Sequence, residues 1–149
     1  EKIFKTKEEL IHKLVDVVSK GGNFLLNVGP EPSGKIRPEE AERLEVVGRW
    51  MDKYSESIYG TTASPLGEVP WGRCTAKPGK LYLHVFDWPT NGKLEVTGLK
   101  NKVKRAYLLA DKKRSGLLVT RESMEKIVIT VPSKAADPFN TVIVLQINK

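Results

Sequence analysis

The stretch Gly21-Gly22-Asn23-Phe24-Leu25-Leu26-Asn27-Val28-Gly29-Pro30 decides how the rest of the chain is interpreted. Its apolar run begins after a glycine pair, ends at Gly-Pro and lacks regular polar alternation, which is typical of a short strand buried on both faces. Such strands belong to parallel sheets, whose members are joined by crossover helices. We therefore predict a buried strand here, and we expect its neighbours in the sheet to precede Glu1.

Helical patterns flank the predicted strand. Thr6 and Glu9 have the spacing of a capping box, and apolar residues then recur at helical intervals as far as Gly21. Pro38 begins a second pattern, with acidic residues in the first turn that favour a helix N-terminus. We predict helices over residues 7–20 and from Pro38 to about Tyr54.

The second half of the chain has a different composition. Residues 57–70 are rich in Gly, Thr, Ser and Pro, which marks a connector. Short β-rich runs separated by turn residues follow, as in an antiparallel sandwich. The runs are residues 80–86, 93–96, 103–109, 116–120, 126–131 and 141–147, with 71–76 as a candidate for one more. The predicted fold class is therefore α+β: a helix–strand–helix piece of a β/α repeat followed by an antiparallel β-sandwich.

Composition excludes several classes of protein. The 149 residues carry a net charge of +7, but the basic residues are spread along the chain, and lysines at strand edges explain them as well as a nucleic-acid site does. No apolar run approaches the roughly 20 residues that a membrane helix needs. Cys74 is the single cysteine, so disulfides within the chain are impossible, and we expect it to be a small buried hydrophobe. We predict no nucleic-acid partner and no membrane span.

The residues do not form a recognisable catalytic motif. Carboxylates are present, but none forms an evident catalytic pair. Neither His12 nor His84 has a nucleophile or a second metal ligand at the spacing that catalytic or metal-binding motifs use. We therefore expect no metal and no cofactor.

Three residues are candidates for substrate binding. Asn27 lies at the carboxyl end of the predicted strand, the end at which parallel α/β folds bind ligands. Trp71 and Trp88 flank a sandwich strand, and sugars stack on aromatic rings. The alternatives are that Asn27 only satisfies neighbouring backbone groups and that the tryptophans belong to the core.

The residues resemble one known family. The segment 14–30 is similar to the sequence near the end of the catalytic barrel of the α-L-fucosidases of glycoside hydrolase family 29. Segments 34–36, 42–44, 48–51 and 56–61 resemble the last barrel helix and its exit, and segments 71–77 and 81–89 resemble the first strands of the C-terminal sandwich in that family. The resemblance implies that residues 1–60 end a (β/α) barrel and that residues 61–149 form the sandwich domain.

The resemblance also implies a function. Family members are retaining exo-glycosidases that remove terminal α-L-fucose from glycans through a covalent intermediate. Both catalytic residues lie on earlier barrel strands in the family, so no catalytic residue is assigned to this chain, which we expect to be inactive alone. A periplasmic or extracellular location is implied by resemblance.

The alternative to a part of an enzyme is a non-catalytic chain whose sandwich binds carbohydrate or has a purely structural role.

One expectation concerns assembly. A strand over residues 24–28 without sheet neighbours leaves backbone groups unpaired. Either the helix pair collapses onto the sandwich, or a second copy of the chain pairs with that edge to form a dimer.

Overall fold

A computed structural model describes residues 4–148. The N-terminal part contains helix α1 (Lys7–Ser19), helix α2 (Pro38–Tyr54) and the single 3₁₀ turn η1 (Ser55–Ser57). The predicted capping box at the start of α1 is present, with the Thr6 hydroxyl accepting from the Glu9 N–H and the Glu9 carboxylate accepting from the Thr6 N–H. Both predicted helices are confirmed to within a residue of their expected ends.

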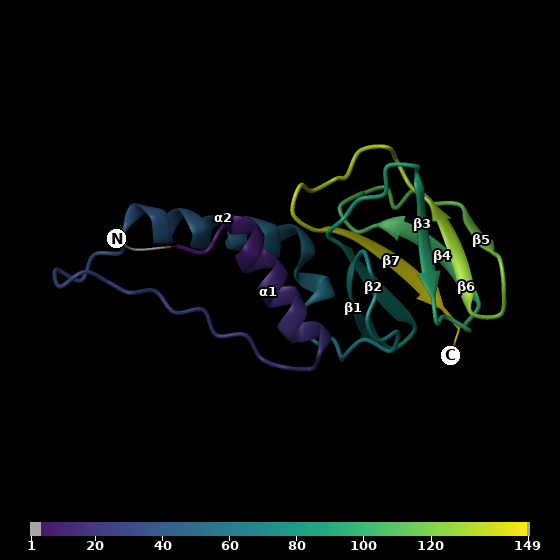
Figure 1. The fold of residues 1–149 in the computed structure, drawn as a ribbon, viewed down its shortest axis with the longest axis horizontal. Coiled ribbons are helices and arrows are strands. Elements are labelled where there is room, and N and C mark those ends of the chain that lie inside the picture. The colour runs from purple at the N-terminus through teal and green to yellow at the C-terminus, as the bar shows by residue number, and fades with distance from the viewer. Residues whose placement is uncertain (1–3, 149) are drawn as a thin grey trace.

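The remainder of the chain forms two antiparallel sheets (Figure 1). The strands are β1 (Gly72–Lys77), β2 (Lys80–Val85), β3 (Lys93–Thr97), β4 (Val103–Leu108), β5 (Val119–Arg121), β6 (Lys126–Thr130) and β7 (Thr141–Ile147). Their order is β1-β2-β7-β4 in one sheet and β3-β6-β5 in the other. The candidate strand over residues 71–76 is confirmed as β1. The run 116–120 contributes only the short β5, because the Leu117 N–H pairs instead with the Ala106 carbonyl of β4.

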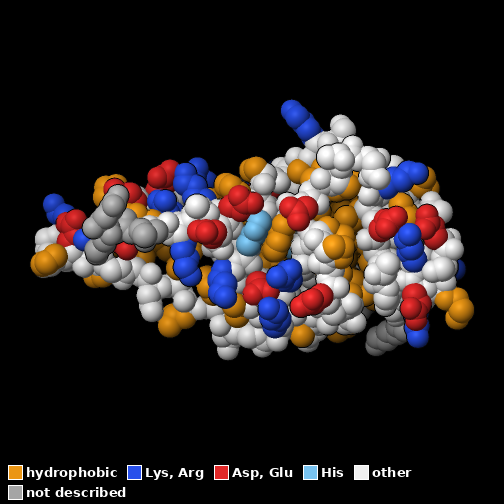
Figure 2. Space-filling model, viewed as in Figure 1, with side chains coloured by type: hydrophobic (Ala, Val, Ile, Leu, Met, Phe, Trp, Pro, Cys, Tyr) orange, Lys and Arg blue, Asp and Glu red, His pale blue; other side chains and the backbone are white. Residues whose placement is uncertain are grey.

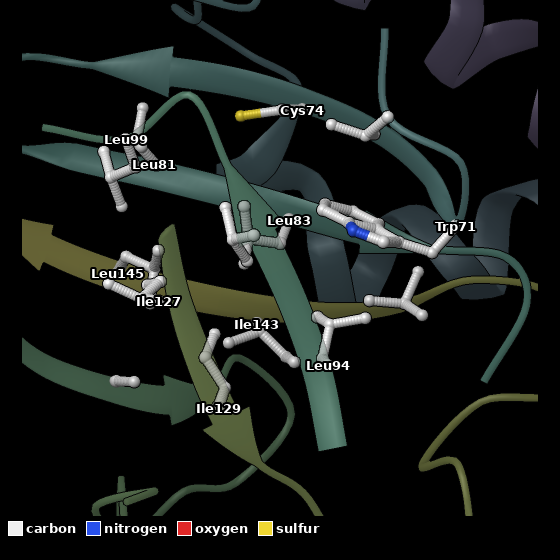
Figure 3. Packing of buried hydrophobic residues seen from close by; sticks show 14 of the residues in the cluster. Trp71, Cys74, Leu81, Leu83, Leu94, Leu99, Ile127, Ile129, Ile143 and Leu145 are labelled. Carbon is white, nitrogen blue, oxygen red and sulfur yellow. The ribbon is translucent and has the colours of Figure 1, made fainter. Parts of the chain in front are cut away.

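The main core lies between the two sheets. Figure 3 shows Leu83 of β2 and Ile143 of β7 facing Leu94 of β3 and Ile129 of β6. Side chains in a strand alternate between its two faces, so every second residue of each strand enters this core. Cys74 lies in the same cluster and is fully buried, in agreement with the prediction from the sequence.

The four-stranded sheet is buried on its other face as well. Tyr82 of β2, Tyr107 of β4 and Val144 of β7 point away from the sandwich core and pack against Ile11 and Trp50 of the two helices. The molecule therefore has three layers: a helix pair, the four-stranded sheet and the three-stranded sheet. The helix pair packs onto the sandwich, which is one of the two arrangements expected for a strand without neighbours, and pairing with a second copy stays a prediction.

The predicted strand over residues 24–28 is not formed. The segment between the two helices runs as extended chain along the outside of the helix pair (Figure 1), and its backbone makes no hydrogen bond from 23 to 28 within the described residues. Leu25 is 82% exposed, so the prediction of burial on both faces is wrong for this chain. The physical reason is that a strand needs a neighbouring strand to pair with, and residues 4–148 supply none at this position.

Candidate functional site

The extended segment keeps the alternation of a strand although it is unpaired. Phe24, Leu26 and Val28 are half-buried, whereas Leu25 and Asn27 between them are exposed. Phe24 packs against the cluster formed by the helices and the outer face of the sheet. One face of the segment therefore rests on the helix layer, and the other, which carries Asn27, points away from it.

A cleft of about 370 Å³ lies between this segment and the first turns of the two helices. Its lining mixes apolar side chains with the polar side chains of Lys5, Asn27, Glu40 and Arg43. The lining residues are Phe4, Lys5, Leu10, Phe24, Leu25, Leu26, Asn27, Val28, Glu40, Arg43 and Leu44. Small-molecule sites are usually hollows that combine apolar walls with a few polar groups, and this lining is more evenly mixed.

Glu40 is the residue of the cleft lining that contacts the end of the extended segment. Its Oε1 accepts a hydrogen bond from the Gly29 N–H at 3.3 Å, which ties the end of the extended segment to helix α2. Its Oε2 is buried without a hydrogen-bond partner among the described residues. A buried carboxylate oxygen is costly to leave unpaired, so this atom calls for a hydrogen-bond donor.

Arg43 does not serve as that donor. Its Nε donates to the Lys5 carbonyl at 2.6 Å, its Nη1 donates to the Glu39 carbonyl at 2.9 Å, and its guanidinium lies 5.4 Å from the centroid of the Phe4 ring. Arg43 therefore holds the chain before α1 against α2. From the sequence alone, the acidic residues in the first turn of α2 had only a role at the helix N-terminus. The contact of Glu40 with Gly29 was missed, because 11 positions separate the two residues and only the fold brings them together.

The two candidate tryptophans lie elsewhere. Trp71 is 7% exposed, packs in the core between the sheets (Figure 3), and donates from Nε1 to the Glu95 carbonyl at 2.9 Å. Trp88 is half-buried at the edge of the same core and donates from Nε1 to the Pro132 carbonyl at 2.8 Å. Neither ring lines the cleft that contains Asn27, so the structure does not gather the three predicted residues into one site.

The histidines have structural surroundings. His84 is fully buried; its Nε2 lies 2.9 Å from Thr75 Oγ1 and its Nδ1 lies 3.0 Å from Asn140 Nδ2. Burial lowers the pKa of His84 to about 3, so the ring is neutral at physiological pH. His12 is half-buried; its Nε2 donates to the Phe139 carbonyl at 2.6 Å, and its ring stacks on Phe86 with centroids 3.8 Å apart.

The cysteine is inert. Burial raises the pKa of the Cys74 thiol to about 12, which keeps it protonated and far from the thiolate form that nucleophiles and metal ligands need. Within residues 4–148, no three His, Cys, Asp or Glu side chains converge on a point where they could hold a metal ion.

Charge and hydropathy add two observations. On the face shown in Figure 2, basic and acidic side chains are interspersed over both the helical part and the sandwich. Neither described helix combines the length and the apolar character that crossing a membrane requires.

Comparison with known proteins relates the chain to one group of enzymes. A family model described as Alpha-L-fucosidase matches residues 1–56. The alpha-L-fucosidase of Dictyostelium discoideum is 32% identical over 143 residues, which are 91% of this chain and 31% of that protein. Human tissue alpha-L-fucosidase is 40% identical over 96 residues, which are 60% of this chain and 20% of that protein.

Solved structures match almost the whole chain. Alpha-L-fucosidase isoenzyme 1 from Paenibacillus thiaminolyticus has a TM-score of 0.88 and 37% identity, over 98% of this chain and 35% of its own. The GH29 alpha-L-fucosidase of Bacteroides thetaiotaomicron, captured as a trapped covalent intermediate, has a TM-score of 0.90 and 30% identity, over 99% of this chain and 34% of its own. The chain therefore belongs to the α-L-fucosidases of glycoside hydrolase family 29 and spans about a third of the length of these solved members.

Proposed function

We propose that this chain is the C-terminal part of a retaining exo-α-L-fucosidase that hydrolyses terminal α-L-fucose from glycans. The observation that carries the proposal is the superposition of nearly the whole chain on solved fucosidases, one of them trapped as a covalent intermediate. In a retaining glycosidase one carboxylate attacks the sugar and a second protonates the leaving oxygen. Both belong to the part of the enzyme outside this chain.

In the complete enzyme, residues 1–60 end the catalytic barrel and residues 61–149 form the accessory sandwich. The extended segment then serves as a barrel strand. Its half-buried face already rests on the helices, and its exposed face, with Leu25 and Asn27, turns to the barrel interior. Glu40 is a positioning residue, because its bond to the Gly29 N–H fixes the end of the strand next to Asn27.

Asn27 is the substrate-binding candidate that this arrangement favours. Its amide stands on the face of the segment that turns away from the helices, at the carboxyl end, where barrel enzymes place their active sites. Trp88 and Trp71 are the sandwich residues proposed to contact glycan. The half-buried Trp88 is the better placed, since the ring of Trp71 is packed in the core.

The experiment is hydrolysis of an aryl α-L-fucoside by this chain and by the full-length enzyme. We expect an inactive chain and an active full-length enzyme whose first-formed product keeps the anomeric configuration. Asn27→Ala in the full-length enzyme should raise KM, whereas Asn101→Ala, far along the chain in the sandwich, should leave it unchanged. A correctly folded full-length protein without fucosidase activity would overturn the proposal.

A second candidate function is binding of fucosylated glycans by the sandwich without catalysis. The bond from Trp88 Nε1 to the Pro132 carbonyl holds the indole in one orientation at the edge of the core, as a stacking platform requires. Titration of the chain and of Trp88→Ala with fucosylated oligosaccharides tests this function. Absence of saturable binding to the unmodified chain would exclude it.

Two further proposals concern assembly and location. The chain alone can dimerise through the unpaired backbone of residues 23–28. Sedimentation at increasing concentration measures this association, and a monomer at all concentrations would exclude the dimer. The full-length enzyme is proposed to act in the periplasm or outside the cell, and its absence from those fractions would contradict that location.

A further inference from the structure

We infer that Asn91, in the turn that leads into β3, is a site of spontaneous deamidation in the folded protein. The reaction needs no enzyme and has water as its co-reactant. The inference rests on the contacts of three consecutive residues and does not depend on the proposed fucosidase activity.

The turn presents an accessible amide next to an unhindered nucleophile. Asn91 is exposed, and the next residue is Gly92, which has no side chain to obstruct its nitrogen. The Gly92 N–H makes no hydrogen bond to any described residue, so the nitrogen is free to react. Gly92 has a φ of +72°, a conformation that glycine adopts without strain.

A hydrogen bond activates the amide carbonyl. The Lys93 N–H donates to Asn91 Oδ1 at 3.1 Å. This oxygen gains negative charge when a nucleophile attacks Cγ, and a fixed backbone donor at that position stabilises the charge, as in an oxyanion hole. The turn thus holds the oxygen while leaving Nδ2 free to depart.

The chemistry conserves atoms and involves no oxidation or reduction. The Gly92 nitrogen, on losing its proton, forms a bond to Asn91 Cγ, the Cγ–Nδ2 bond breaks, and Nδ2 leaves as ammonia with that proton. The product is a five-membered succinimide. Water then adds to one of its two carbonyl carbons and opens the ring, which leaves either aspartate or isoaspartate at position 91.

Other asparagines in the chain lack this combination. Asn140 is fully buried and its side-chain amide is bonded to His84. Asn101 donates from Nδ2 to the Asn148 carbonyl at 2.8 Å and is followed by a lysine. Asn27 precedes the β-branched Val28, which crowds the attacking nitrogen.

The site lies in the loop that carries Trp88. The Gly92 carbonyl accepts from the Val131 N–H at 2.8 Å, and Trp88 donates to the neighbouring Pro132 carbonyl. Isoaspartate at position 91 would add one methylene to the main chain immediately before the first of these bonds. Both products therefore add a negative charge to the loop, and isoaspartate also changes the backbone next to the bonds that hold Trp88.

The test is incubation of the folded chain at mildly alkaline pH, followed by protease digestion and mass spectrometry. We expect the peptide containing positions 91 and 92 to gain the mass that separates a carboxyl from an amide, as a mixture of aspartate and isoaspartate, while the peptides containing Asn101 and Asn140 keep their masses. Asn91→Gln should abolish the change and Asn101→Gln should leave it intact. An unchanged amide at Asn91 while the chain stays folded would overturn the inference, as would faster change at Asn101.

A second measurement separates the role of the fold from that of the local sequence. A peptide spanning residues 88–95 contains the same Asn91-Gly92 pair, but the fold does not fix its turn. If the Lys93 N–H activates the carbonyl, the folded chain deamidates at least as fast as the peptide. Strong protection in the folded chain would overturn the inference that the native turn is the reactive form.

Discussion

Asn140 Nδ2 donates a hydrogen bond to His84 Nδ1 at 3.0 Å, and both residues are completely buried. On the other side of the ring, Thr75 Oγ1 donates to the Ser57 carbonyl at 2.6 Å and therefore accepts from His84 Nε2–H. The main-chain carbonyl of Asn140 accepts a hydrogen bond from Trp50 Nε1 at 3.2 Å. This chain of bonds joins helix α2 and turn η1 to the sandwich through one neutral histidine tautomer.

His84 makes the stability of the chain dependent on pH. Its pKa falls from 6.5 to about 3 on folding because burial disfavours the charged ring. The stabilisation is complete above pH 6.5 and is lost as the pH falls through the window towards 3, since only the unfolded state binds the proton there. The free energy of unfolding should fall by up to ~1.4 kcal/mol per pH unit below 6.5.

Urea unfolding at several pH values between 6.5 and 5 measures this slope. The variant His84→Gln, even if less stable overall, should show a flatter profile than the unmodified chain. His12→Gln is the matched control at a half-buried histidine, and its free energy of unfolding should keep the pH dependence that His84 causes. Identical profiles for the unmodified chain and His84→Gln would contradict the assignment.

Packing of the helix pair against the sheet is the second testable feature. Ile11 is fully buried between α1 and the outer face of the four-stranded sheet. Ile11→Ala should lower the free energy of unfolding by ~2–5 kcal/mol, because it removes buried surface and leaves a cavity. The exposed Leu118 provides the control, since Leu118→Ala should change stability by less than ~0.5 kcal/mol. Equal effects at the two positions would show that α1 does not pack as described.

The ion pair between Arg73 of β1 and Asp16 of α1 gives a third prediction. Arg73 Nε lies 2.8 Å from Asp16 Oδ1, and this hydrogen bond, reinforced by Lys20, lowers the pKa of the Asp16 carboxyl below 3.8. Its contribution to stability is present above pH 3.8 and is lost as the pH falls through the lowered pKa. An NMR titration of Arg73→Gln should show the Asp16 pKa moving up towards 3.8, whereas Arg49→Gln should leave it in place. An Asp16 pKa unaffected by Arg73→Gln would contradict the pairing.

Leu25 distinguishes the chain from the proposed full-length enzyme. It is 82% exposed here, so Leu25→Asp should change the stability of the chain by less than ~0.5 kcal/mol. In the full-length protein the same change places a charge inside the proposed barrel and should strongly lower soluble yield or stability. Comparable tolerance in the two proteins would contradict the proposal that residues 24–28 form a barrel strand.

Local patterns located most elements, because the signals lie within a few residues of one another. The capping box at Thr6, the proline at the start of α2 and the β-rich run that forms β6 each act over one or two turns or one strand. The prediction of a buried strand over residues 24–28 was wrong because its partners would have to be distant in the sequence. Its apolar run has the composition of a buried strand, but hydrogen-bond partners must come from another strand, and the described residues contain none for it.

The candidate site also combines features that follow from local sequence with features that depend on tertiary structure. The sequence placed Asn27 at the end of a run of apolar residues and indicated the fucosidase family from contiguous motifs. Tertiary structure alone revealed the bond from Gly29 to Glu40 and the His84 network, and it decided that Trp71 lies in the core. These contacts join residues 9 to 90 positions apart. Secondary structure and family follow from neighbouring residues, whereas burial, pKa and cleft geometry depend on which distant side chains the packing brings together.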